Sequence, residues 1–152
     1  MTQATIRARI KVTLDTVTNK GLTHDYMRWV VDDTAFRDIA KTTITTAQIR
    51  VWMIDYAGFT ADSPWISRST QALRVHTFVL HGYMGLDDSA ATAKTFAVLA
   101  EAVCNALDDD ATLNANALSK YTVACQLDID HVLFYSNLCH RATIALGVAE
   151  IV

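Results

Sequence analysis

Histidine, cysteine and aspartate are the side chains of this sequence that could support metal, nucleophilic or acid–base chemistry. His76 and His81 lie five positions apart in a run that is predicted to be a β-strand. Successive side chains of a strand point to opposite faces, so the two histidines are expected on opposite faces. They are therefore not predicted to share a metal ion, and we interpret them as partly buried or interface histidines.

Two other groups have residue types that suit catalysis. Cys139 and His140 are adjacent, so on a strand they point apart, and a cysteine nucleophile would need a histidine from elsewhere, such as His131. Asp128 and Asp130 could join His131 in an acid–base or metal cluster. Aspartates that alternate with apolar residues are also typical of the solvent side of a strand end.

No motif in the sequence predicts a reaction centre. Glycine-rich phosphate-binding patterns and a GxSxG serine setting are absent from the sequence. The three cysteines, Cys104, Cys125 and Cys139, have no CxxC spacing, which is typical of a reduced chain without structural disulfides. We expect no catalytic residue, no cofactor and no metal site.

Composition indicates one globular domain spanning residues 1–152, because 51% of the residues are hydrophobic. No apolar run has the length of a membrane span, and no secretion signal is recognised. The net charge of −3 argues against nucleic-acid wrapping. The basic residues Arg7, Arg9, Lys11 and Lys20 are expected to form a solvated helix face, or alternatively to contact an acidic partner.

The centre of the chain predicts a strand, a turn and a helix, in residues 72–81, 82–85 and 87–107. Residues 87–89 are expected to cap that helix. A closing strand at residues 141–151 is expected to pair with the first strand. The predicted buried stripe of the helix is Thr92, Phe96, Leu99, Ala100, Val103 and Leu107.

The N-terminal half predicts a helix at residues 2–18, a short strand at 22–26 and a short helix at 35–41. A strand at 48–56 is apolar on both faces, so we expect it to be covered on both sides. Residues 58–69 are predicted to be the loop of a long hairpin.

The segment between the helix and the closing strand has weaker signals. Residues 108–110 are three consecutive aspartates and are expected to form a solvated loop. Residues 111–119 are predicted to be irregular, 122–129 a strand, and 130–137 a loop or helical turn.

These pieces, in their order, resemble a known family. The sequence runs from an amphipathic helix through GLTHDY and RW to QIRVWMIDY, LRVHTFVLHGYMGLDDS, FAVLAEAVCNAL and HRATIALGVAEIV. It resembles the tail-terminator and neck proteins of long-tailed bacteriophages, of siphovirus or myovirus type. The resemblance implies an α+β fold in which a small antiparallel or mixed sheet packs against an N-terminal helix and one long central helix, with a long β-hairpin.

The resemblance also implies a function. In that family the protomers form a six-membered ring in the virion, after assembly in the host cytoplasm. The ring ends tail-tube growth and joins the tube protein to the head-completion or connector protein, and DNA passes its lumen without specific binding. The expected interface residues, on the hairpin at residues 48–81, are Trp52, Tyr56, Trp65, Arg50 and Arg68.

Three alternatives remain open. Trp52 could lie in the core and not at an interface. The chain could be another neck component, such as a head-closure or tail-tube-like protein. A small α+β enzyme that uses Cys139 or the Asp128–His131 group is the third alternative, and it requires two of those side chains to meet in a concave pocket.

Overall fold

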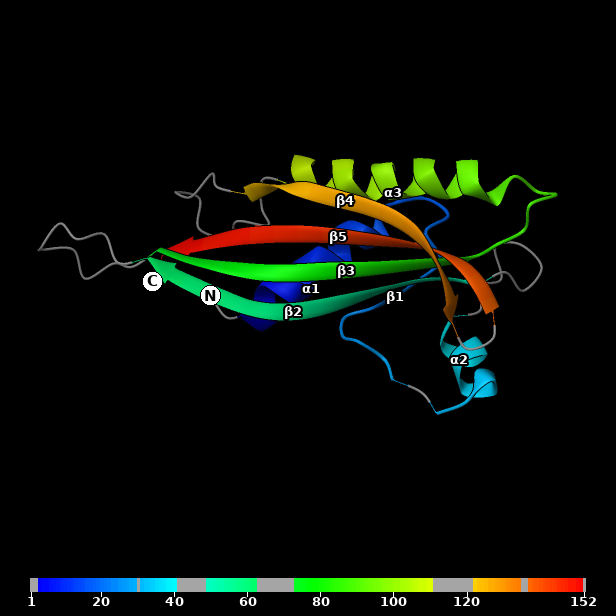
Figure 1. Ribbon diagram of the computed structural model, residues 1–152. Coiled ribbons are helices and arrows are strands. Elements are labelled where there is room, and N and C mark those ends of the chain that lie inside the picture. The colour runs from blue at the N-terminus through cyan, green and yellow to red at the C-terminus, as the bar shows by residue number, and fades with distance from the viewer. Residues whose placement is uncertain are drawn as a thin grey trace, which may run out of the picture.

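The computed structural model describes residues 3–29, 31–40, 49–62, 73–110, 122–134 and 137–151. Within them, five strands form one mixed sheet in the order β1-β2-β3-β5-β4 (Figure 1). The strands are β1 (Leu22–His24), β2 (Arg50–Asp62), β3 (Leu73–Gly85), β4 (Thr122–Phe134) and β5 (Asn137–Ile151). The helices are α1 (Gln3–Asp15), α2 (Asp33–Ala40) and α3 (Thr92–Asp109). The expected α+β fold is confirmed.

The main core lies between one face of the sheet and the helices α1 and α3. All six residues of the predicted stripe on α3 are buried, and Cys104 lies on the same side. Helix α1 contributes Ile6, Ile10 and Leu14, as its spacing predicts. Each fully buried aliphatic or aromatic side chain stabilises the fold by about 1.5–3 kcal/mol, so this face holds most of the hydrophobic free energy.

A smaller cluster lies on the opposite face, beside α2. Helix α2 begins at Asp33, two residues before the predicted start, and the side chain of Asp32 accepts a hydrogen bond of 2.8 Å from the amide of Ala35. Ala40 packs there with Val51 and Met53 of β2. The side chains of residues 51–54, which point alternately to the two faces of the sheet, are all buried. The prediction that this strand is covered on both faces is therefore confirmed.

The predicted pairing of the two long strands is confirmed, and β3 lies antiparallel to β5 from Leu73↔Ile151 to Gly85↔Cys139. The predicted turn at residues 82–85 is wrong, because these residues continue β3. A Cβ on Gly82 would lie 2.6 Å from the indole of Trp52. The glycine is therefore needed for side-chain packing and does not mark a turn.

The predicted helix cap is also displaced. Helix α3 begins at Thr92, and the preceding Ala91 has a left-handed φ of 51° and no side-chain cap. The Asp87 carboxylate instead accepts hydrogen bonds from the Ser89 hydroxyl at 2.7 Å and the Ala90 amide at 3.3 Å. The acidic run at residues 87–89 therefore stabilises a turn that precedes the helix.

Two other loop predictions need correction. β2 continues to Asp62, past the predicted loop start at residue 58. β4 continues to Phe134 and β5 begins at Asn137, so most of the predicted loop at 130–137 is a β-hairpin. The predicted irregular stretch at 111–119 lies outside the described residues. No helix among the described residues is long and apolar enough to cross a membrane.

Candidate assembly interface

β4 is an outer strand of the sheet and is thirteen residues long. Within the described part of the chain it pairs only with β5, from Thr122↔Val148 to Phe134↔Asn137. Every second backbone N–H and C=O of an edge strand points away from its sheet. Such a row of donors and acceptors is a template for pairing with another strand.

The other side of the sheet has a second open edge. β1 pairs with only three residues of β2, from Leu22↔Val51 to His24↔Met53. Residues 54–62 of β2 have no further strand beside them among the residues that the structure describes. Within the described residues, the fold therefore presents two different open edges on opposite sides of one sheet (Figure 1).

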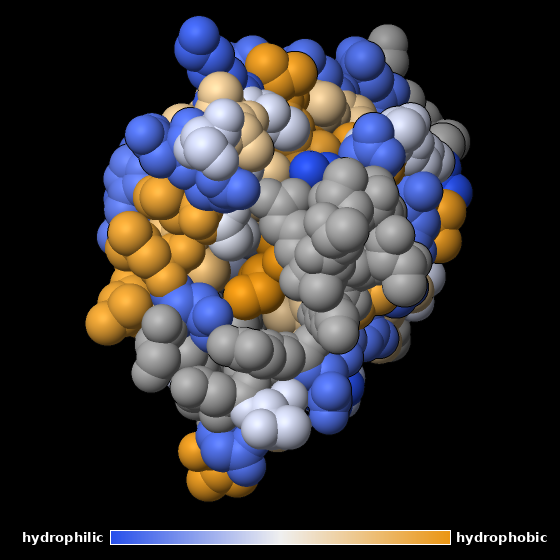
Figure 2. All heavy atoms as spheres, turned by 90° about the vertical axis from the view of Figure 1, so that its right-hand side faces the viewer, coloured by the Kyte–Doolittle hydropathy of each residue, from blue (hydrophilic) through white to orange (hydrophobic). Residues whose placement is uncertain are grey.

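Exposed apolar side chains accompany the β4 edge. Leu133 and Leu138 form a cross-strand pair near the β4–β5 turn and are 69% and 51% exposed. Ile129, farther along β4, is 44% exposed. Figure 2 views the end of the molecule at which β4 ends and β5 begins, and hydrophobic surface is visible on that end. Clustered apolar surface on an edge hairpin is typical of a site of protein association.

The face of the sheet opposite α1 and α3 is charged near this edge. Asp130 and Arg141 are cross-strand partners, and Arg141 Nε donates to Asp130 at 2.8 Å. This hydrogen bond lowers the pKa of Asp130. Next to them, burial lowers the pKa of His81, and Asp55 partly opposes that effect.

The structure places the predicted interface residues differently. Trp52 is 1% exposed and lies in the main core, the alternative that the sequence left open. Arg50 is also buried, and its guanidinium donates to the carbonyl of Asn19 at 3.0 Å. Trp65 and Arg68 lie outside the described residues.

Tyr56, the remaining predicted interface residue, belongs to a buried polar network. Its hydroxyl lies 3.0 Å from Nδ1 of His76, and Nε2 of His76 lies 2.8 Å from Oε2 of Glu150. Burial alone would raise the pKa of Glu150, but hydrogen bonds, including that with His76, outweigh it and lower the pKa. The network links β2, β3 and β5, and the interpretation of His76 as a buried residue is confirmed.

The other chemistry candidates do not converge. Cys139 and His140 point to opposite faces of β5, as predicted: Cys139 joins the α2 cluster, and His140 stacks on Phe96 of α3. Nε2 of His140 lies 3.0 Å from the hydroxyl of Thr92, and its ring lies 5.0 Å from that of His131. Among the described residues, no three histidine, cysteine or acidic side chains are grouped as a metal site.

Asp128 and Asp130 lie on one face of β4, and His131 lies on the other. On β5 the cross-strand partner of Asp128 is Thr143, that of Asp130 is Arg141, and that of His131 is His140. The alternation that separates them follows directly from the strand period. The acid–base or metal cluster that these three residues could have formed is therefore absent from the described structure, and the two aspartates lie on the exposed side of the strand.

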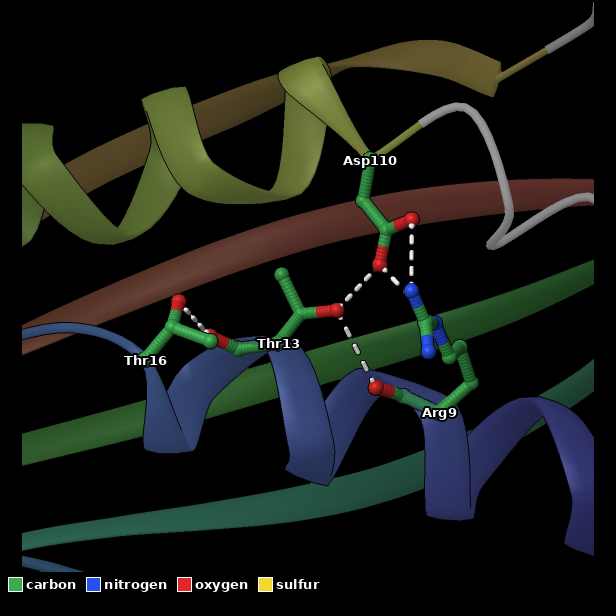
Figure 3. A network of polar contacts seen from close by, with 4 residues as sticks. All are labelled: Arg9, Thr13, Thr16 and Asp110. Carbon is green, nitrogen blue, oxygen red and sulfur yellow. Dashed lines mark hydrogen bonds and ion pairs between the residues drawn. The ribbon is translucent and has the colours of Figure 1, made fainter.

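The basic face of α1 is largely neutralised by carboxylates. Asp110, predicted to be solvated, points from the end of α3 towards α1 (Figure 3). It accepts hydrogen bonds from Arg9 Nε at 3.1 Å and from the Thr13 hydroxyl. Lys11 and Lys20 both pair with Asp15, at 3.0 and 2.7 Å. These contacts pair Arg9, Lys11 and Lys20, three of the four basic residues of the predicted face, with carboxylates.

The sequence interpretation missed the β4 edge. Its signal is present in residues 126–134, where Leu127, Ile129 and Leu133 fall on one face of an alternating run and His131 takes the remaining position. The loop predicted from residue 130 cut this strand short, whereas the aspartates lie on the exposed side of a strand, the interpretation that the sequence also offered for them. Comparison with protein-family models found no match, and a search of curated proteins found no similar sequence.

Proposed function

We propose that this chain is a structural virion protein that forms a ring at the head-proximal end of a phage tail. The ring has six members in the tail-terminator family that the sequence resembles. In this role it ends growth of the tail tube and joins the tail to the connector complex. The resemblance of the sequence supports the position in the particle. The observation that carries the assembly is the pair of different open edges on opposite sides of one sheet.

The two edges suit a head-to-tail contact. When one protomer offers its β4 edge to the open part of β2 on the next, each protomer retains one free edge of each kind. Contacts between unlike surfaces close into a ring when the rotation between protomers divides the circle evenly. An isologous dimer would use the same edge twice and would stop at two copies.

Size-exclusion chromatography with light scattering tests the ring. Six copies of the 16.8 kDa chain give a particle of about 100 kDa. A β4-edge variant, Ile129→Lys with Leu133→Lys, is expected to be monomeric, because charged side chains block edge pairing. A β2-edge variant, Thr60→Lys with Ala61→Lys, should behave in the same way.

Mixing the two edge variants distinguishes head-to-tail from isologous contacts. Each variant keeps the edge that the other lacks, so the mixture should form heterodimers that neither variant forms alone. Val98→Lys is the control, because Val98 is 67% exposed on α3 and belongs to neither edge strand. A wild-type chain that remains monomeric at all concentrations would refute the ring, and an edge variant that still forms it would refute the edge contact.

The position in the particle has its own test. Antibodies against the chain should label the head-proximal end of tails in electron micrographs of the particles that contain it. Label along the tube, or on heads that lack tails, would instead assign it to the tube or to head closure.

A further inference from the structure

Two thiols meet where α3 packs on the edge strand β4. The Cys125 thiol donates a hydrogen bond to the backbone carbonyl oxygen of Cys104, with Sγ 3.9 Å from that oxygen, so the side chains of the two cysteines are neighbours. Cys104 is 9% exposed, and Cys125 is half-buried. The two residues are free cysteines in separate elements, and their contact does not follow from their spacing in the sequence.

An irregularity in β4 aims Cys125 at the helix. The register of β4 against β5 shifts between Val123 and Gln126, so Cys125 lies in a bulge. Its amide donates to the Asp108 side chain of α3 at 3.2 Å, in place of a ladder partner on β5. At this bulge, a cysteine of the edge strand lies against the helix.

The contact makes the two thiols unequal. The hydrogen bond from Cys125 lowers the pKa of Cys104, although burial opposes this effect. The same bond, together with burial, raises the pKa of Cys125 above its ordinary value. Cys139 has no thiol partner in the described structure, and burial raises its pKa to about 11. A thiolate beside a second thiol is the arrangement of redox-sensitive cysteine pairs.

We propose that Cys104 and Cys125 form a peroxide-sensitive thiol pair, in which Cys104 is oxidised and Cys125 resolves the product as an intramolecular disulfide. The Cys104 thiolate attacks one oxygen of hydrogen peroxide and breaks the O–O bond. This step leaves a sulfenic acid and a hydroxide, which takes up a proton to become water. Cys125 then attacks the sulfenic sulfur, the S–O bond breaks, and a second water leaves with the Cys125 proton. One peroxide is reduced to two waters as two thiols become one disulfide.

The disulfide would tether α3 to β4 at the bulge and close the chain between them into a covalent loop. A cross-link of this kind restricts the unfolded chain. It would therefore hold the edge strand against the helix under oxidising conditions. The inference does not depend on the proposed assembly, because both thiols belong to one protomer.

Mass spectrometry of the reduced protein after hydrogen peroxide treatment tests the proposal. Wild type should lose about 2 Da, as two hydrogens, with a Cys104–Cys125 cross-link in its peptide map, and dithiothreitol should reverse the loss. Cys139→Ala should behave in the same way. Cys125→Ser should retain a sulfenic acid at Cys104 that dimedone traps, whereas Cys104→Ser should form no such adduct at Cys125.

A second measurement does not depend on cysteine variants. Oxidation should raise the urea midpoint of wild type, and dithiothreitol should restore the original value. A wild-type chain that keeps its mass under peroxide, or that links Cys139 instead, would overturn the proposal. So would trapping of Cys125 in preference to Cys104.

Discussion

Gly82→Ala is expected to destabilise the protein by overpacking its core. The added methyl group would lie 2.6 Å from two carbons of the Trp52 indole, whereas carbon atoms pack best at about 3.5–4.0 Å. Gly82 cannot retreat, because its strand is held between Trp52 on β2 and Ala142 on β5. Inserting a methylene into a packed core costs about 1–3 kcal/mol, and with three indole atoms contacted we expect about 2–3 kcal/mol.

A double-mutant cycle isolates this contact. Trp52→Leu should cost about 2–4 kcal/mol by itself, because Trp52 is fully buried. In that background Gly82→Ala should cost nothing, or gain up to about 1 kcal/mol, since alanine is favoured over glycine within a strand. The coupling free energy should therefore be at least about 2 kcal/mol.

Urea unfolding followed by circular dichroism measures all four corners of the cycle, without relying on the fluorescence of the mutated tryptophan. An equal cost of Gly82→Ala in both backgrounds would refute the steric argument. Glycine would then be required at position 82 for its backbone conformation, and not to make room for the indole of Trp52.

Two further predictions concern pH and backbone conformation. Burial, and then the charge of His131, lowers the pKa of His140 in the folded protein. The contribution of neutral His140 to the free energy of unfolding is therefore complete above the pKa of histidine in the unfolded chain, about 6.5, and is lost as the pH falls below that value. Urea midpoints between about pH 7.5 and 5.5 should fall less steeply for His140→Gln than for wild type, and equal slopes would contradict this assignment. Gly21 and Gly58 both have a positive φ, but only at Gly21 would an added Cβ meet the backbone, 2.3 Å from the carbonyl oxygen of Arg50. In urea unfolding, Gly21→Ala should therefore lower the free energy of unfolding by at least about 2 kcal/mol more than Gly58→Ala does. Equal costs for the two would show that backbone strain alone decides.

The sequence predicted best where one local period decides the structure. The buried stripe of α3 follows from side-chain spacing alone, and the structure buries its residues as predicted. The separation of His76 from His81, and of Cys139 from His140, follows from the same period of two. These predictions need no knowledge of which strands are neighbours.

The predictions failed where a distant partner outweighs a local signal. Gly82 and Gly85 suggested a turn. The indole of Trp52, thirty positions before Gly82 in the chain, instead occupies the space that a side chain at position 82 of the strand would need. Asp130 suggested a loop, but Arg141 pairs with it across the β4–β5 hairpin. Turn-forming residues indicate only what the backbone permits, and tertiary packing determines which conformation is adopted.

The same distinction explains why the candidate interface moved from an aromatic hairpin to the strand edges. Aromatic residues indicate large contact areas, but Trp52 uses its surface inside the main core. Whether a strand is an edge depends on the order of strands in space, and no local pattern records that order. The shortness of β1, which leaves most of β2 open, and the position of β4 beyond β5 are both properties of this order. Periodicity therefore assigns faces to residues, whereas the edges that another chain could pair with emerge only when the sheet is assembled.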